Sequence, residues 1–241
     1  MNFYKIKKKL LKQHFQPNYF FYFIFPYSIY RRELYLGLKK ILISLKGDIV
    51  DIGCGSKPYE NLCINANKYI GLDLATSSHN HKNSKVDIFF DGINLPFENN
   101  CFDNAVAFEV LEHVEELDLL MAETSRILKS KGLFVATIPF IWPEHEQPYD
   151  FRRLTSYGLI KLFEKHKFKV LDVQKLGSFW SNLFQQIITY IDSFIMKKGK
   201  IRKFLWPFFS IPLNFCSLII DSLLPKNKDF YNNLIIIGRK I

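Results

Sequence analysis

The 241-residue sequence contains only four cysteines, and none of them forms a Cys-x-x-Cys pair. So few cysteines in a chain of this length argue against a disulfide framework. They also show no metal-ligand spacing with the six histidines. We therefore expect reduced thiols, a cytoplasmic location and no bound metal. Internal repeats are lacking as well, and 48% hydrophobic with 23% charged residues excludes a disordered chain.

A secretory signal is not expected from the first thirty residues. Their basic stretch (Lys5, Lys7, Lys8, Lys9 and Lys12) precedes an apolar run that starts only near Tyr19 and contains Pro26. That run also lacks a small-residue cleavage site. Tyr19–Tyr30 is too short to cross a bilayer.

Positive charge is unevenly placed along the chain. Of the net charge of +10, residues 1–47 carry +9, residues 48–175 carry −5 and residues 176–241 carry +6. Two basic ends therefore flank an acidic centre. This distribution does not fit a uniformly basic nucleic-acid-binding protein.

Short apolar segments alternate with helical ones between residues 48 and 174, which predicts an α/β fold with a parallel sheet covered on both faces. The expected strands are Ile49–Ile52, Tyr69–Leu72, Val86–Phe89, Asn104–Phe108, Leu133–Ile138, Lys169–Val173 and Asn232–Lys240, and the expected helices are Arg31–Leu45, Tyr59–Ala66, Leu117–Leu128 and Ser156–His166. Four parts follow: a basic, aromatic helical extension (1–46), a core (47–175), a hydrophobic insertion (176–229) and a last core strand (230–241).

The first expected strand runs into a glycine turn, Asp51-Ile-Gly53-Cys54-Gly55. Glycines let the backbone turn sharply and approach a ligand closely. Asp73 ends the next strand, where a carboxylate can accept both hydroxyls of a ribose. Pro58 stands where a pyrophosphate-binding motif has its third glycine. The pattern therefore favours a nucleoside without phosphates.

Several further motifs follow in register, namely Gly71-Leu-Asp73, Asp91-Gly-Ile-Asn-Leu-Pro-Phe97, Phe102-Asp103, Glu109-Val-Leu-Glu-His-Val114 and Arg126-Ile-Leu-Lys129 with Gly132. With the glycine turn they resemble the class I S-adenosylmethionine-dependent methyltransferases, in particular the small-molecule branch with the ubiquinone-biosynthesis enzymes. The resemblance covers about residues 47–175. It implies a Rossmann-like seven-stranded sheet of order 3-2-1-4-5-7-6, with strand 7 antiparallel and helices on both faces.

The resemblance also implies a role for each matching residue toward S-adenosylmethionine. Asp51, Gly53 and Gly55, with Cys54 between the glycines, would hold the methionine moiety, and Asp73 with Leu74 the ribose. Asp91, Gly92 and Leu95 would surround the adenine, and Phe108 with Glu109 would line the floor near the sulfonium. Two alternatives stay open: Asp91 could be a turn residue, and Glu112 and His113 could serve only to start the following helix.

Candidate acceptor-binding residues gather after the fifth strand, in residues 139–155. A hydroxyl acceptor needs a base, and His145 is the candidate. Tyr149, Asp150 and Arg152 are candidate substrate contacts. Alternatively, His145 only holds the loop, and Arg152 or Arg153 pairs with Asp150. Thr155 fits the N-cap of the next helix.

The apolar run Phe204–Ile220 carries no charge and follows a basic cluster of Lys197, Lys198, Lys200, Arg202 and Lys203. Its length would suit a membrane span, but we expect Pro207 and Pro212 to interrupt the helix. A surface element meeting anionic lipid at the inner membrane face is one interpretation. A lid or a dimer contact is the other.

The sequence thus predicts an S-adenosylmethionine-dependent methyltransferase acting on a small molecule, with a lipid-linked or cell-surface sugar as one candidate. An RNA or protein methyltransferase and a catalytically silent partner protein are the alternatives. Nucleic acid is disfavoured by the acidic centre.

Overall fold

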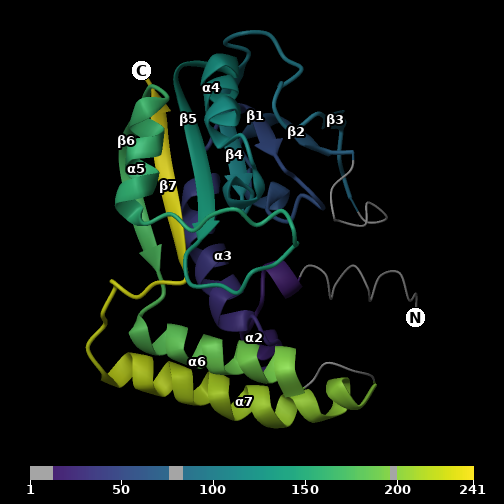
Figure 1. Ribbon diagram of the computed structural model, residues 1–241, viewed down its shortest axis with the longest axis vertical. Coiled ribbons are helices and arrows are strands. Elements are labelled where there is room, and N and C mark those ends of the chain that lie inside the picture. The colour runs from purple at the N-terminus through teal and green to yellow at the C-terminus, as the bar shows by residue number, and fades with distance from the viewer. Residues whose placement is uncertain (1–12, 76–83, 196–199) are drawn as a thin grey trace. The chain divides into compact units, whose positions relative to one another are not determined.

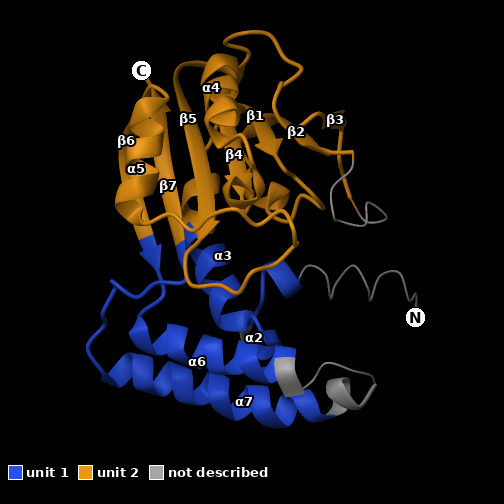
Figure 2. Cartoon of the chain, in the orientation of Figure 1, with its two compact units in different colours: residues 1–37, 175–233 blue, residues 38–174, 234–241 orange. Residues whose placement is uncertain are grey.

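The computed structural model describes residues 13–75, 84–195 and 200–241. The chain forms two compact units, unit 1 (1–37 and 175–233) and unit 2 (38–174 and 234–241), coloured in Figure 2. The N-terminal lysines 5–12 and Lys197–Lys198 lie outside the described residues.

A seven-stranded sheet forms the centre of unit 2 (Figure 1). Its order, β3-β2-β1-β4-β5-β7-β6, confirms the order expected from the resemblance. The strands are β1 (Gly47–Ile52), β2 (Ala66–Leu74), β3 (Ile88–Phe90), β4 (Phe102–Phe108), β5 (Leu128–Pro139), β6 (Phe168–Leu176) and β7 (Asn233–Lys240).

The strands from β3 to β5 pair in parallel, whereas β6 and β7 are antiparallel. Ile241 donates to the carbonyl of Lys167 at 3.0 Å, and Asn232 donates to that of Leu176 at 2.8 Å. The end of β7 therefore lies beside the start of β6, and the start of β7 lies beside the end of β6. The two strands run in opposite directions, so the sheet is mixed, as expected.

Parallel pairing brings the carboxyl ends of the central strands to one edge of the sheet. In this register Ile52 pairs with Leu72, and Phe108 pairs with Thr137. The glycine turn after β1, Asp73 in β2, Glu109 after β4 and the loop after β5 therefore leave the sheet at the same edge, where ligand sites of α/β proteins form.

The expected helix over Tyr59–Ala66 is wrong. The chain makes only a 3₁₀ turn there, η1 (Glu60–Leu62), and β2 already begins at Ala66. The glycine turn and Pro58 occupy the first half of this short connection. The asparagines in its second half (Asn61 and Asn65) favour turns over helix, because their side chains compete for backbone hydrogen bonds.

Helices α4 (Leu117–Ile127) and α5 (Ser156–Lys165) run alongside the sheet, as expected (Figure 1). Each buries an apolar stripe that includes Leu120 and Met121 in α4, and Leu159 and Phe163 in α5. The Thr155 hydroxyl accepts from the N–H of Gly158 at 3.1 Å, which confirms its role as N-cap. A second 3₁₀ turn, η3 (Leu111–His113), precedes α4.

Unit 1 is helical in the part that the structure describes. It contains α2 (Tyr19–Ile24), most of α3 (Ser28–Leu42), α6 (Phe179–Tyr190), the π-helical turn η4 (Ile191–Ile195) and α7 (Lys200–Leu223). Helix α3 begins and ends three residues earlier than expected. Its first residue, Ser28, is buried, and the Ser28 hydroxyl donates to the carbonyl of Phe25 at 2.7 Å.

The expectation that prolines interrupt the apolar run is also wrong, since α7 continues through Pro207 and Pro212. Each proline removes one helical hydrogen bond, but packing of the buried side of α7 outweighs this local cost. Over Leu205–Leu223 the helix is long and apolar enough to cross a membrane, by length and composition alone. Core helices of soluble proteins meet the same criterion.

Candidate functional site

The turn after β1 is shaped by two glycines in left-handed conformation, Gly53 (φ 68°) and Gly55 (φ 48°). A Cβ on Gly53 would lie 2.5 Å from the Val110 side chain, so this position requires glycine. A Cβ on Gly55 would meet nothing within 4 Å. The backbone at Gly55 therefore faces open space into which a ligand can approach.

The Asp73 carboxylate is attached to this turn. Its Oδ2 accepts from the N–H of Gly55 at 2.9 Å, and its Oδ1 accepts from the N–H of Leu74 at 2.8 Å. A carboxylate has about four acceptor positions, so each oxygen keeps a free lone pair. Two adjacent hydroxyls of a ribose can bind to these lone pairs.

Asp51 lies beneath the turn and is almost fully buried, at 1% exposure. Burial raises its pKa to about 7, although the Tyr69 hydroxyl, which donates to Oδ2 at 2.7 Å, opposes this shift. Cys54 is buried beside it, and burial raises the pKa of its thiol. Asp51 is therefore a carboxyl that a cationic ligand group would ionise.

The neighbouring side chains support the turn from below. Buried Lys57 pairs with Asp87, whose Oδ2 also accepts from the N–H of Gly71 at 2.7 Å. This pair fixes β2 against the turn. No motif identified Lys57 and Asp87 as a pair, because thirty residues separate them.

Asp91 lies in an exposed turn rather than in a closed pocket. Its Oδ1 accepts from the N–H groups of Ile93 and Asn94 at 2.8 and 2.7 Å, and Asn94 Nδ2 donates to Oδ2. The hydrogen bonds of Asp91 are therefore those of a turn residue. Gly92 adopts φ 92°, and Leu95 is buried. The role of these three residues toward adenine stays a prediction.

Phe108 and Glu109 end β4 at the same edge. Glu109 adopts φ 57°, which is strained for a residue with a side chain. Its backbone N–H donates to the Thr137 hydroxyl at 3.0 Å, and the hydroxyl donates back to Glu109 Oε1 at 2.7 Å. These two bonds hold the strained residue in place. The Phe108 ring contacts the Tyr59 ring edge-on.

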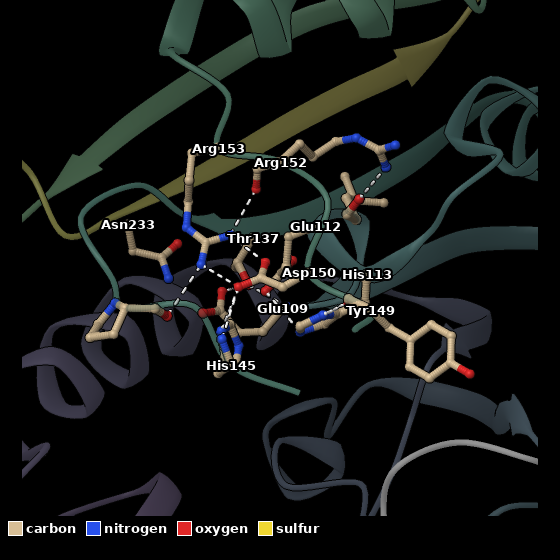
Figure 3. A network of polar contacts seen from close by, with 12 residues as sticks. Glu109, Glu112, His113, Thr137, His145, Tyr149, Asp150, Arg152, Arg153 and Asn233 are labelled. Atoms are coloured by element: carbon tan, nitrogen blue, oxygen red, sulfur yellow. Dashed lines mark hydrogen bonds and ion pairs between the residues drawn. The ribbon is translucent and has the colours of Figure 1, made fainter. Parts of the chain in front are cut away.

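The loop after β5 holds His145 through Asp150 (Figure 3). His145 Nδ1 lies 3.2 Å from Asp150 Oδ2, and its backbone N–H donates to the same oxygen at 3.0 Å. Arg153 donates to both Asp150 oxygens, at 2.5 and 2.7 Å, and the pKa of Asp150 is about 2, because these bonds outweigh its burial. The ionised carboxylate can only accept, so His145 Nδ1 donates. Burial lowers the pKa of His145 and favours the neutral ring, whose Nε2 keeps its lone pair.

Arg152 contacts backbone carbonyl groups, and its contact with the substrate stays a prediction. Its guanidinium donates to the carbonyl oxygens of Leu111 and Glu115 at 3.0 Å and to that of Val114. It therefore ties the loop to the segment around η3. Tyr149 is half exposed, and Figure 3 shows its ring pointing away from the histidines. Its backbone carbonyl instead accepts from His113 Nδ1 at 2.5 Å.

Glu112 and His113 join His145 in a cluster that the sequence did not predict. Ligand atoms of the three side chains lie within 4.8 Å of one another, and the two imidazole rings are 4.7 Å apart. Glu112 is fully buried, and neither of its oxygens has a hydrogen-bond partner. Burial, reinforced by nearby Glu109, raises its pKa well above the usual value.

Both histidines use Nδ1 for a contact within the protein. A carbonyl oxygen can only accept, so His113 Nδ1 donates to Tyr149, and His113 Nε2 lies 3.6 Å from Glu112 Oε1. Two imidazole nitrogens and one carboxylate suit a divalent transition metal such as Zn²⁺ or Fe²⁺. The partners of both Nδ1 atoms are the outer contacts that orient such ligands. The interpretation of Glu112 and His113 as a mere helix start is wrong, because α4 begins only at Leu117.

Comparison with known proteins supports the resemblance. Residues 50–136 match a family model described as a methyltransferase domain. A probable S-adenosylmethionine-dependent methyltransferase of Mycolicibacterium smegmatis is 30% identical over 143 residues, which cover 55% of each chain. A ubiquinone biosynthesis O-methyltransferase of Pelagibacter ubique is 29% identical over 99 residues, 37% of this chain and 41% of that one. The chain spans about half the length of the curated relatives it matches.

Solved structures agree in fold. An S-adenosylmethionine-dependent methyltransferase of Thermotoga maritima has a TM-score of 0.54 at 15% identity, covering 98% of this chain and 95% of that one. The [4+2]-cyclase SpnF has a TM-score of 0.55 at 18% identity, covering 85% and 80%. At these identities the likeness concerns the fold alone.

The glycine turn, the Asp73 carboxylate and the sheet order therefore agree with the matched domain. The open space at Gly55 and the buried carboxyl of Asp51 fit a cofactor with a ribose and a cationic amino-acid end. Residues 50–136 of this chain therefore form a methyltransferase domain that resembles those of class I, and S-adenosyl-L-methionine is the cofactor of this domain.

Proposed function

We propose that this protein transfers the methyl group of S-adenosylmethionine to a hydroxyl of a small-molecule acceptor. The observation that carries the proposal is the cluster of Glu112, His113 and His145 at the edge where the cofactor motifs end. Transfer from a sulfonium needs mainly an aligned nucleophile, because the methyl is already electrophilic. What the protein must add for a hydroxyl is a means of removing its proton.

The cluster offers two ways to remove that proton. In the first, His145 is the base: Asp150 orients its ring, and Nε2 is free to accept. In the second, the three side chains would hold a divalent cation, and that cation would lower the pKa of a hydroxyl bound to it. The second is favoured by the Glu112 carboxyl, whose two buried oxygens lack hydrogen-bond partners. A cation would satisfy these oxygens, whereas the base mechanism leaves them unexplained.

The class of acceptor is inferred from more general features. Two curated relatives are named ubiquinone biosynthesis O-methyltransferases, which supports oxygen as the acceptor atom. A lipid-linked or cell-surface sugar belongs to this class of hydroxyl acceptors. The acidic centre of the sequence weighs against RNA, because phosphate binding needs clustered positive charge.

The test measures transfer of labelled methyl from S-adenosylmethionine into small-molecule fractions of a cell extract, with and without a chelator. We expect EDTA to abolish transfer and added Zn²⁺, Fe²⁺ or Mn²⁺ to restore it. Glu112→Gln, His113→Asn and His145→Asn should each lower turnover by about 10²-fold or more and weaken metal binding. Affinity for S-adenosylmethionine should stay nearly unchanged.

Glu116→Gln is the matched control, because this exposed neighbour loses the same charge outside the cluster. If EDTA has no effect while His145→Ala still costs about 10²–10⁴-fold in turnover, His145 is the base and the cation is excluded. Label appearing only in RNA or protein would contradict the small-molecule acceptor. Cofactor binding without transfer to any fraction would indicate a silent partner protein.

A further inference from the structure

The buried side of α7 is polar. Ser210 and Asn214 are fully buried, and Ser217 is buried at 1% exposure. The Ser210 hydroxyl donates to the carbonyl of Ile24 at 3.2 Å, and Asn214 Nδ2 donates to that of Phe23 at 3.1 Å. Trp206 Nε1 also donates to Ile24, at 2.6 Å. Helix α7 is thus held against the end of α2 by hydrogen bonds.

The exposed side of α7 is apolar. Phe208, Phe215 and Leu223 are 68%, 55% and 76% exposed, at spacings that place them along one stripe of the helix. We call the following exposed residues the α7 outer face: Phe208, Phe209, Ile211, Phe215, Leu218, Ile219 and Leu223. Such a stripe faces the core in an ordinary amphipathic helix.

Helix α6 shows the same inversion, in which polar residues are buried and apolar residues are exposed. Ser181, Asn182, Gln185 and Thr189 are buried, whereas Leu183, Ile187 and Tyr190 are exposed. Gln185 Nε2 donates to the carbonyl of Pro26 at 2.9 Å, and Asn182 Nδ2 donates to that of Phe230 at 2.8 Å. The buried apolar side chains that contact these two helices form a small cluster of Tyr22, Ile29, Ile188 and Trp206.

The helices of unit 2 have the usual polarity. Helix α5 buries Leu159 and Phe163 and exposes Lys161 and Glu164. The inversion is therefore a property of α6 and α7. Polar residues inside and apolar residues outside characterise helices surrounded by lipid, where Ser, Asn and Gln join helices together.

The charges around α7 indicate which partner covers its outer face. No acidic residue occurs between Ser193 and Ile220, and five basic residues precede the uncharged run Phe204–Ile220. Protein interfaces carry a polar rim with mixed charges. A wholly apolar stripe next to a purely basic segment instead matches an anionic bilayer surface.

We propose that α6 and α7 form a membrane-docking element, whose α7 outer face inserts among the lipids of an anionic bilayer surface. The element lies in the interface rather than across it. The 12 residues of α6 span about 18 Å, less than the hydrocarbon thickness of about 30 Å. Helix α7 in turn is bonded through Trp206, Ser210 and Asn214 to the end of α2, which has only six residues.

The experiment is flotation of the full-length protein with vesicles of phosphatidylcholine, with or without phosphatidylglycerol. We expect binding to the vesicles with phosphatidylglycerol. A triple variant, Phe208→Ser, Phe215→Ser and Leu223→Ser, should lower the partition coefficient by at least about tenfold. These three positions are exposed, and an unchanged circular dichroism spectrum together with unchanged affinity for S-adenosylmethionine will verify that the variant is folded.

Tyr157→Ser is the matched control, since this aromatic residue is 79% exposed on α5, in unit 2, and should leave flotation unchanged. Cys216 supplies a second measurement, because its thiol is exposed on α7. In a Cys101→Ser background, a polarity-sensitive dye on Cys216 should shift to the blue when vesicles with phosphatidylglycerol are added.

Three outcomes would overturn the proposal. In the first, the protein does not bind vesicles and forms a dimer that the triple substitution dissociates, because a second copy would then cover the α7 outer face. Another is equal flotation of the wild type and the triple variant. The third is resistance to extraction by alkaline carbonate from cell membranes, which would mean that α7 spans the bilayer.

Discussion

At the scale of single residues, the site combines two buried carboxyl groups, of which one accepts hydrogen bonds from the backbone and the other has no hydrogen-bond partner. Asp73 accepts two backbone hydrogen bonds and keeps lone pairs for a ribose. Glu112 is fully buried, yet neither of its oxygens has a hydrogen-bond partner. A buried group without partners is costly, so its retention points to a ligand that satisfies it.

Replacing Asp73 tests the ribose contact. Asp73→Ala removes a charged acceptor and should weaken S-adenosylmethionine binding by about 1.5–3 kcal/mol. Calorimetric titration of the purified protein measures the change. Asp172→Ala is the control, because Asp172 lies exposed on β6 and should have no effect. Unchanged affinity in Asp73→Ala would remove Asp73 from the cofactor site.

Asp51 predicts how cofactor affinity depends on pH. Burial raises its pKa to about 7, so the free protein holds a proton there below that pH. A cationic amino group of the ligand favours the ionised carboxylate, and affinity should therefore fall as the pH drops below 7. Because one pH unit changes the ionised fraction about tenfold, titrations with S-adenosylhomocysteine at pH 7.5 and pH 6 should differ by about fivefold to tenfold.

Two variants of this site should change the pH dependence in different ways. Asp51→Asn should remove the pH dependence, because no proton is then exchanged. Tyr69→Phe removes the hydrogen bond that lowers the Asp51 pKa, so the loss of affinity should move to higher pH. A flat wild-type profile between pH 6 and pH 7.5 would show that Asp51 does not bind the charged end of the ligand.

At the scale of elements, the loop after β5 and the turn η3 form one assembly. Arg152 from the loop donates to three carbonyl groups around η3, and the N–H of Phe151 donates to the carbonyl of Glu112 at 2.9 Å. These bonds bring His145 and Glu112 together although 33 positions separate them in the numbering. The site thus depends on a fixed loop more than on any single helix.

Arg152 should accordingly affect turnover by positioning the loop that carries His145. Arg152→Lys keeps the charge but loses the planar fork that reaches several carbonyls. We expect turnover to fall by about tenfold or more, with little change in S-adenosylmethionine affinity. The readout that separates positioning from substrate contact is metal affinity by calorimetry, which should weaken along with turnover. A rise in acceptor KM alone would restore Arg152 as a substrate ligand.

At the scale of the whole molecule, charge and polarity divide between the ends and the centre of the chain. The acidic centre of the sequence lies in unit 2, which contains the sheet, whereas much of the basic excess belongs to unit 1. The inverted helices α6 and α7 belong to unit 1 too. Cofactor binding and surface attachment should therefore respond to different substitutions.

Salt dependence follows from this division. Each basic residue near an anionic surface contributes about 1 kcal/mol, and this attraction is screened by salt. Flotation with vesicles should weaken sharply when NaCl rises well above physiological strength. Replacing Lys197, Lys198, Lys200, Arg202 and Lys203 by Gln should release the protein at low salt, with unchanged affinity for S-adenosylmethionine. If salt releases the wild type but the variant binds vesicles as strongly as the wild type, the charged contact lies elsewhere on the protein.

The sequence alone determined the core of this protein. Strand and helix periods, the glycine turn and the acidic residue that ends β2 are local signals, because they depend on neighbours along the chain. The alternation of strands and helices therefore predicted a doubly covered parallel sheet, and the resemblance supplied its order. The helix expected over residues 59–66 failed because the short connection held too many turn-forming residues for its helical pattern.

Only the tertiary structure decided the features that depend on distant partners. Glu112 and His113 meet His145 because β4 and β5 end at one edge and Arg152 ties their loops. Helix α7 turns its polar side inward because Ser210 and Asn214 find carbonyl groups of α2 to bond. A helical pattern reveals that two faces differ, but which face is covered depends on the hydrogen-bond partners that the rest of the chain presents.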